Sequence, residues 1–190
     1  MSVAFIQEAD FQILDWIRRY LRCDALDWLM PKISFLGNAG ILWIILAVAL
    51  LCTKKYRERG LSMAYGLIAQ LLIGNLFLKN LIARSRPCWI RPEIALLVKV
   101  PQDYSFPSGH SMVSFIAATV LWHYDRRWGA AAYVLAVLIG FSRLYLYVHF
   151  PTDVLCGAVL GIAVGAAVMY VVRRRGAAHE SDGDLPPAKA

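Results

Sequence analysis

Long apolar stretches alternate with short charged stretches along this chain. Five stretches contain no Asp, Glu, Lys or Arg: residues 33–53, 60–78, 104–124, 128–142 and 154–172. A helix needs about 20 predominantly apolar residues to cross a bilayer, and the fourth stretch reaches that length if it continues past Arg143 to residue 148. The pattern predicts an all-α, polytopic membrane helix bundle with about five transmembrane helices.

The two ends of the chain have different patterns. In the first 32 residues apolar side chains recur at helical spacing among charged ones, which predicts an amphipathic helix. That helix could lie along the membrane interface or pack on the end of the bundle. The last residues are polar and rich in Gly, Pro and Asp, which is typical of disorder. We therefore expect an amphipathic N-terminal segment (1–32), a transmembrane domain (33–173) and a disordered tail (174–190).

Composition agrees with a membrane protein. Hydrophobic residues make up 59% of the 190 residues, whereas soluble domains have about 45–50%. This excludes a water-soluble globule, and it also excludes a disordered chain, which would have low hydrophobicity. The net charge of +7 could indicate nucleic acid binding. Because the basic residues lie between apolar stretches, we expect no nucleic acid partner.

The charged loops predict an orientation. Residues 54–59 (KKYRER), 125–127 (DRR) and 173–175 (RRR) fall on one face of a five-span bundle, and the positive-inside rule makes that face cytoplasmic. We expect a multi-pass plasma (inner) membrane protein with a cytoplasmic C-terminus. Residues 79–103 and 143–152 fall on the opposite face. There Lys79 and Arg143 stand at the ends of apolar stretches, either as functional residues or as snorkelling anchors.

The four cysteines form no CxxC pair and no metal-ligand spacing. Cys23 and Cys88 could lie on the same side of the membrane, so a disulfide between them is one possibility. Sequence alone does not decide it.

The first candidate for chemistry is the segment from Lys79 to Pro87. Arg86 follows Lys79 by seven residues, close to two helical turns, so a continuous helix would project both side chains from one side. Pro87 favours an extended conformation at Arg86 and a helix end there. An ammonium and a planar guanidinium together suit a phosphate group.

The second candidate is the sequence Pro-Ser-Gly-His before the third apolar stretch. Ser108 is a natural N-cap, and Gly109 lets a ligand approach free backbone N–H groups at the helix start. His110 can hold or give a proton near neutral pH. The alternative is an ordinary helix cap without a catalytic role.

The third candidate surrounds His149. Pro151 fits the first turn of the last apolar stretch, which also places Asp153 in that turn, where the helix dipole favours its charge. A carboxylate that accepts from one imidazole nitrogen leaves the other free as a nucleophile. The alternative is a His–Asp pair that only caps the helix. The residues alone do not decide which histidine attacks.

Together these segments read K-x6-R-P, P-S-G-H and S-R-x5-H-x3-D. In this order they resemble the three-part signature of the type 2 phosphatidic acid phosphatase superfamily, and all eleven signature positions match. The resemblance covers roughly residues 34–172 and leaves out both ends of the chain.

The resemblance implies a metal-independent phosphatase that works through a phosphohistidine, with no cofactor. His149 would be the nucleophile, Asp153 would orient it, and His110 would be the general acid. Five residues would bind the phosphate oxygens: Lys79, Arg86, Ser108, Gly109 and Arg143.

A site at the outer membrane edge suits a lipid phosphate, and we expect membrane lipids and this substrate as the binding partners. The candidates are undecaprenyl pyrophosphate, phosphatidylglycerophosphate and phosphatidate. The alternative is a non-hydrolytic transporter or binder of phosphorylated lipids, although a binder would need the cations but not two histidines and a carboxylate. The oligomeric state is not predicted.

Overall fold

The computed structural model describes residues 3–183, with side-chain surroundings given for residues 5–175. Every regular element in this part of the chain is a helix, which confirms the all-α prediction. The elements are α1 (Val3–Tyr20), α2 (Asp24–Leu36), η1 (Asn38–Gly40), α3 (Ile41–Cys52), η2 (Lys54–Tyr56), α4 (Arg57–Ala69), the π-helix η3 (Gln70–Leu78), α5 (Lys79–Ile82), α6 (Pro87–Ile90), α7 (Gly109–Tyr124), α8 (Arg126–Tyr145) and α9 (Pro151–Gly183).

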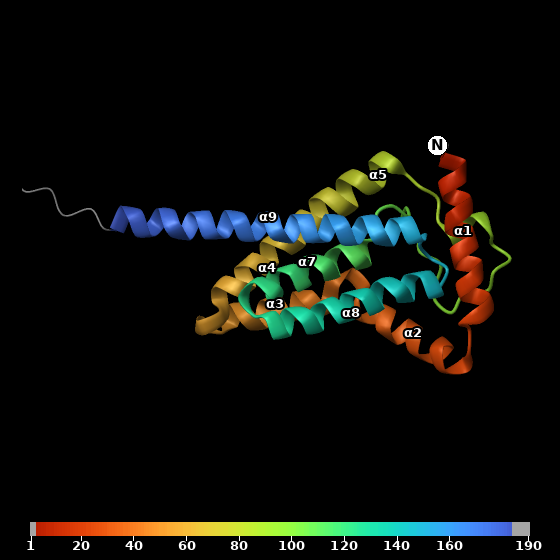
Figure 1. Ribbon diagram of the computed structural model, residues 1–190, viewed down its shortest axis with the longest axis horizontal. Helices are drawn as coiled ribbons and strands as arrows, with labels where there is room; N and C mark the ends of the chain where they lie inside the picture. The colour runs from red at the N-terminus through yellow and green to blue at the C-terminus, as the bar shows by residue number, and fades with distance from the viewer. Residues whose placement is uncertain (1–2, 184–190) are drawn as a thin grey trace, which may run out of the picture.

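Helix α7 forms the centre of the bundle, between α8, α9 and α4 (Figure 1). Its side chains are buried on several faces, because successive residues such as Met112, Val113 and Ser114 are all buried. Helix α9 approaches α7 closely because glycines line the contact: a Cβ atom built on Gly161 would lie 2.6 Å from the backbone oxygen of Met112. Small residues at such spacing let membrane helices pack backbone to backbone.

Three helical segments are long and apolar enough to cross a membrane: Lys54–Ile90, Arg126–Tyr145 and Pro151–Arg175. A fourth span results if the bent pair Asp24–Leu36 and Asn38–Cys52, which meets at 42°, is one crossing. The sequence predicts a fifth at 104–124, but α7 begins only at Gly109 and has 16 residues. Residues 104–108 are non-helical and belong to the loop that precedes α7.

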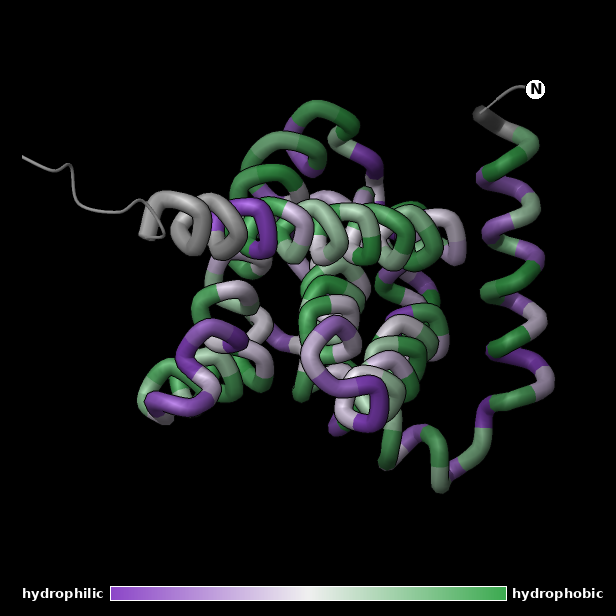
Figure 2. The backbone as a smooth tube through the Cα atoms, turned by 60° about the vertical axis from the view of Figure 1, so that its left-hand side comes forward, coloured by the Kyte–Doolittle hydropathy of each residue, from purple (hydrophilic) through white to green (hydrophobic). Residues whose placement is uncertain are grey.

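Helix α1 lies across the end of the bundle, at a steep angle to the other helices (Figure 1). Hydrophobic and hydrophilic positions alternate along it (Figure 2). Phe11, Leu14 and Ile17 are buried against the bundle, whereas Ile13 and Trp16 are exposed. The sequence allowed two placements for this helix, along the membrane interface or on the end of the bundle. The structure shows that it packs on the end of the bundle.

The loops divide between the two ends of the bundle. The α3–α4 and α7–α8 connections lie at the end toward which α9 extends, and α1 lies at the other end together with the long loop after α6 (Figure 1). Hydrophilic segments gather at the ends, and the helices between them are largely apolar (Figure 2). This matches the alternation of loops that the apolar stretches predict.

Two boundaries differ from the expected ones. Helix α2 runs through residue 32, so the N-terminal segment does not end there as a separate unit. Helix α9 continues past residue 174 as far as Gly183, into the expected disordered tail, and residues 184–190 lie outside the described residues. Cys23 and Cys88 are both free thiols, Cys23 exposed and Cys88 buried.

Candidate active site

The helix is interrupted between α5 and α6. Helix α5 ends at Ile82, and Ala83 adopts a left-handed conformation with φ 46°. The prediction of a continuous helix from Lys79 to Arg86 is therefore wrong. The expectation from Pro87 is confirmed, because Arg86 is extended (φ −79°, ψ 153°) and Pro87 begins α6. Despite the interruption, both cations reach the same carboxylate, Asp103.

Lys79 and Arg86 meet at a carboxylate that the sequence analysis did not single out. Asp103 accepts from the Lys79 ammonium, and Arg86 Nη2 donates to Asp103 Oδ1 at 2.8 Å. Burial raises the pKa of Asp103, but the hydrogen bond from Lys79 and the charge of Arg86 outweigh it and lower the pKa to about 2. Both cations are buried, whereas the Asp103 side chain is 56% exposed. A phosphate that enters here competes with one ionised carboxylate for two cations.

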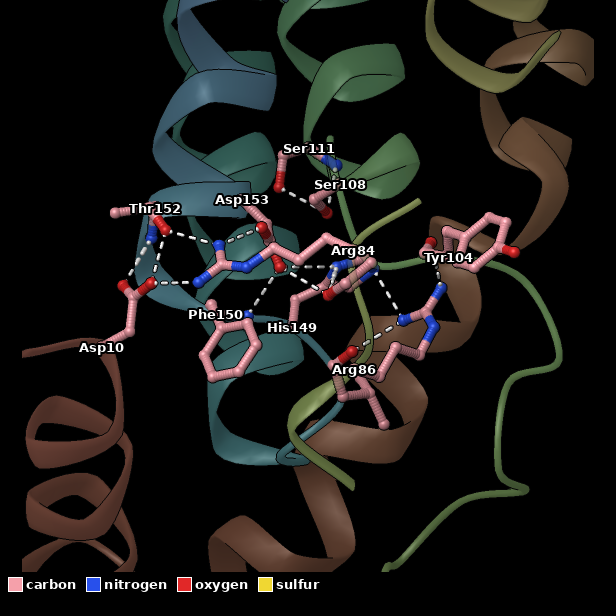
Figure 3. A network of polar contacts seen from close by, with 12 residues as sticks. Asp10, Arg84, Arg86, Tyr104, Ser108, Ser111, His149, Phe150, Thr152 and Asp153 are labelled. Atoms are coloured by element: carbon pink, nitrogen blue, oxygen red, sulfur yellow. Dashed lines mark hydrogen bonds and ion pairs between the residues drawn. The ribbon is translucent and has the colours of Figure 1, made fainter. Parts of the chain in front are cut away.

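His149 lies fully inside, beside Arg86 (Figure 3). Arg86 Nη1 lies 3.0 Å from His149 Nε2 and 2.7 Å from the backbone oxygen of Val148. Because a guanidinium only donates hydrogen bonds, we assign Nε2 as the acceptor and the proton of the neutral ring to Nδ1. The lone pair of Nε2 thus faces the cations.

The Nδ1 side of His149 faces a serine and a carboxylate. Ser105 Oγ lies 3.4 Å from Nδ1, and Asp153 Oδ2 lies 3.7 Å away, longer than a hydrogen bond. Ser105 donates to the same Oδ2 at 2.5 Å, and the Phe150 backbone N–H donates to it at 3.0 Å. Asp153 stands in the first turn of α9, which begins at Pro151. The position of Asp153 beside His149 is as predicted, but the expected hydrogen bond from the imidazole to this carboxylate is not formed, and Ser105 is an additional contact.

The electrostatic surroundings keep His149 neutral. Burial lowers its pKa well below the ordinary value, and the charges of Arg86, Arg143 and Lys79 lower it further. The contact with Asp153 is therefore not an ion pair. A neutral imidazole with an unprotonated Nε2 is the form that can act as a nucleophile.

Ser108 caps α7 as predicted. Its hydroxyl accepts from the Ser111 N–H at 3.4 Å. A Cβ atom built on Gly109 would lie 3.2 Å from Asn75 Oδ1 and 3.9 Å from the Lys79 nitrogen. The start of α7 thus faces Lys79, and Gly109 has no side chain between them. A ligand can therefore approach the backbone closely at this point.

His110 lies on the other side of the helix start, and its Nε2 is 2.9 Å from Asn38 Oδ1. Asn38 belongs to η1, between α2 and α3. Since the amide oxygen is an acceptor, Nε2 carries the proton of the neutral ring. A Cβ atom on Gly37 would lie 2.7 Å from the His110 ring, so this glycine leaves room for the imidazole.

Arg143 is the third buried cation, near the end of α8. Its Nη1 donates to Ser34 Oγ. Among residues 5–175, its Nε is the one buried side-chain nitrogen or oxygen without a hydrogen-bond partner. A buried donor of this kind is costly unless a ligand satisfies it.

A groove of about 560 Å³ leads away from these residues. One end is lined by Lys79, Asp103, Gly109 and His110, and the remainder runs along α3 and α4 between largely apolar side chains. Several of these side chains are also open to the outside, including Ile44 and Ile68. The groove thus joins a polar end to the apolar surface of the bundle.

The structure brings all eight predicted site residues to the same end of the bundle, around Lys79, Arg86 and His149. It adds Asp103, Ser105 and Asn38, which no pattern pointed to because their partners are 17 to 72 residues away in sequence. Within residues 3–183, no cluster of three or more His, Cys, Asp or Glu side chains is arranged to hold a metal ion. Three cations, two imidazoles and two carboxylates on an all-helical membrane bundle make up the kind of site that a phosphate-transferring enzyme uses.

Comparison with known proteins agrees with this class. The family model described as "PAP2 superfamily" matches residues 59–177. An undecaprenyl-diphosphatase of Sulfolobus acidocaldarius is 32% identical over 143 residues, which cover 75% of this chain and 68% of the relative. A decaprenylphosphoryl-5-phosphoribose phosphatase of Mycobacterium tuberculosis is 34% identical over 139 residues, which cover 72% and 75%.

A solved structure is also similar over nearly the whole chain. The PAP2 type phosphatidylglycerolphosphate phosphatase of Bacillus subtilis aligns with a TM-score of 0.72 and 29% identity, over 99% of this chain and 90% of that one. This chain belongs to the PAP2 superfamily. It is a membrane phosphatase, and its relatives are phosphatases of lipid substrates.

Proposed function

We propose that this protein is an integral membrane phosphatase that hydrolyses the phosphate or pyrophosphate headgroup of a lipid through a phosphohistidine. Undecaprenyl pyrophosphate is the first candidate substrate, before phosphatidylglycerophosphate and phosphatidate. The observation that carries the proposal is the groove of about 560 Å³. It connects a cluster of cations and histidines with the apolar side of the bundle, as a phosphate on a lipid tail requires.

The proposed reaction gives each of the two histidines a different role. His149 Nε2 attacks phosphorus, so that an N–P bond forms and the bond to the leaving oxygen breaks. His110 acts as the acid in its doubly protonated form, so that the cationic ring gives one proton to that oxygen and becomes neutral. Water then attacks the phosphohistidine, His110 takes up a proton from it, and inorganic phosphate leaves. Asp153 stabilises the positive charge that His149 carries in the intermediate.

The phosphate oxygens are held by the remaining predicted residues. Lys79, Arg86 and Arg143 supply positive charge, and Arg143 Nε gains the partner that it lacks among protein atoms. Ser108 and the Gly109 N–H group complete the site at the start of α7. Positive groups fixed in place stabilise the charge that spreads over the oxygens in the transition state.

The membrane arrangement belongs to the same proposal. The bent pair α2–α3, the segment from α4 to α5, and α7, α8 and α9 make five crossings, with α7 about 24 Å long. The basic α3–α4 and α7–α8 loops face the cytoplasm of a plasma (inner) membrane together with the C-terminus, and the site opens on the extracytoplasmic face. Helix α1 then lies at that outer face, where its exposed Ile13 and Trp16 meet the lipid interface.

Phosphate release in detergent tests this function. With EDTA present, we expect release from all three candidate lipids and the highest kcat/KM for undecaprenyl pyrophosphate. Ala64→Phe narrows the groove and should raise KM for the lipid roughly tenfold, while KM for water-soluble p-nitrophenyl phosphate stays the same. Ala163→Phe places the same ring on an exposed position of α9 and serves as the control. Absence of release from every lipid would favour the transporter or binder, and a requirement for a divalent metal would contradict the mechanism.

The proposed nucleophile also predicts the pH dependence. His149 must be neutral to attack, and its pKa lies well below the ordinary 6.5 because of burial and the neighbouring cations. The His149 imidazole is therefore protonated, and loses its ability to attack, only when the pH falls below 6.5. Since kcat/KM reports the free enzyme, we expect its acidic limb below pH 6.5. A limb above that value, measured with a substrate already ionised there, would contradict a neutral His149.

A further inference from the structure

Arg84 occupies an unspecified position of the K-x6-R-P segment and bonds directly to Asp153, a specified position of the family signature. It stands on the extended segment between α5 and α6, and its Nη1 donates to Asp153 Oδ1 at 2.6 Å (Figure 3). The same Nη1 donates to Thr152 Oγ1 at 2.8 Å. Its guanidinium lies 4.0 Å above the Phe150 ring. Arg84 thus contacts three of the four residues that follow His149.

The other branch of the guanidinium leads to α1. Arg84 Nη2 donates to Asp10 Oδ2 at 2.7 Å. Asp10 is 2% exposed, and it also accepts from the Thr152 N–H at 3.0 Å and from the Thr152 hydroxyl at 2.5 Å. Two buried carboxylates, Asp10 and Asp153, therefore share one arginine. Buried carboxylates are costly unless a cation pairs with them, so the position of each depends on Arg84.

The backbone of Arg84 holds a second group near His149. Its carbonyl oxygen accepts from the Ser105 N–H at 2.8 Å. Ser105 in turn donates to Asp153 Oδ2 and lies 3.4 Å from His149 Nδ1. Asp153 and Ser105, the two groups that face Nδ1, are thus both fixed by the same arginine.

We propose that Arg84 is a positioning residue for phosphoryl transfer and that Asp10 anchors it, which makes α1 part of the catalytic apparatus. Arg84 occupies Oδ1 of Asp153 and so directs Oδ2 toward His149. This inference rests on the proposed function of His149 as the nucleophile. When the N–P bond forms, Nδ1 keeps its proton and the ring becomes positive. A correctly oriented Oδ2 then stabilises that charge.

The test measures kcat and the pH profile of kcat/KM. The variant Arg84→Gln removes a positive charge and leaves Asp153 without its cation, and both changes favour protonated His149. We expect kcat to fall about 10- to 100-fold and the acidic limb to move up by about one pH unit. The other charged or titratable groups around His149 stay in place in this variant: Lys79 on α5, Arg86 before α6, Asp103 on the loop, His110 on α7, Arg143 on α8 and Asp153 on α9.

The variant Arg84→Lys keeps the charge but has one nitrogen where the guanidinium uses two. We expect it to fold and to keep the acidic limb of the unaltered protein, with an intermediate kcat. If Arg84→Gln does not fold, Arg84→Lys still tests the proposal through kcat. Unchanged kcat in Arg84→Lys, or an unmoved limb in a folded Arg84→Gln, would overturn it.

A matched pair on α1 separates positioning from simple anchoring. Asp10 and Asp15 both hold α1 through an arginine, but Asp15 bonds Arg91 and Tyr147 and does not touch Asp153. We expect Asp10→Asn to lower kcat several-fold per folded molecule and Asp15→Asn to lower only the melting temperature. Equal kcat losses would overturn the role of Asp10. If His149→Ala stays active, the proposed function itself fails, whereas an inactive His149→Ala with a normal Arg84→Gln refutes only this inference.

Discussion

Replacing His149 with alanine should lower kcat for lipid phosphate hydrolysis by at least about 10⁴-fold. The imidazole is fully buried, its Nε2 lies beside Arg86, and its Nδ1 faces Ser105 and Asp153. Residues 5–175 contain three histidines, of which His123 is at the exposed end of α7 and His110 is bonded to Asn38. Water alone would then have to attack a phosphate whose negative charge repels it. Phosphate release from undecaprenyl pyrophosphate in detergent measures the effect.

The control is His123→Ala, which removes an exposed imidazole from α7 and should leave kcat within about twofold, as an exposed substitution usually does. Substrate labelled with ³²P adds an independent readout. The unaltered protein should take up covalent label during turnover, and His149→Ala should take up none. Substantial activity or covalent label in His149→Ala would show that another group attacks phosphorus.

Local rules of helix formation account for much of what the sequence predicts about the site. Ser108 caps α7 and Pro151 begins α9 because the preferences of a cap residue and of proline act within one helical turn. Asp153 falls in the first turn of α9 for the same reason. The helices within the apolar stretches follow from the length of those stretches, which is also a property of neighbouring residues.

The features of the site that the sequence predicts incorrectly, or does not predict, depend on contacts between distant segments. The left-handed Ala83 ends α5 early, although nothing in an alanine codes for that conformation. Asp103 and Ser105 come from a loop without periodic pattern, and Arg84 meets Asp10 from 74 residues away. Their polar character is visible in the sequence. Their partners are not, because a single chain gives no information on which buried charges will meet.

Arg86→Lys should lower kcat by about 10²- to 10³-fold although the charge is kept. All three nitrogens of Arg86 are in use: Nε donates to the Asp103 backbone oxygen at 2.6 Å, Nη1 to Val148 and His149, and Nη2 to Asp103 Oδ1. One ammonium cannot replace this planar arrangement. In the proposed mechanism these donors bind the oxygens that gain charge in the transition state, so the loss should appear in kcat. Steady-state kinetics with p-nitrophenyl phosphate checks it without a lipid tail.

Arg91→Lys is the matched control, because Arg91 also bonds a carboxylate with short contacts, 2.9 and 2.8 Å to Asp15, but lies outside the site. We expect a lower melting temperature and a kcat within about twofold. If Arg86→Lys behaves like Arg91→Lys, Arg86 acts only as a buried charge. If it loses activity while its melting temperature matches that of Arg91→Lys, the planar guanidinium takes part in the reaction. The bonds that Arg86 makes with Asp103 must then exchange for bonds with phosphate in every catalytic cycle, because the same nitrogens serve both.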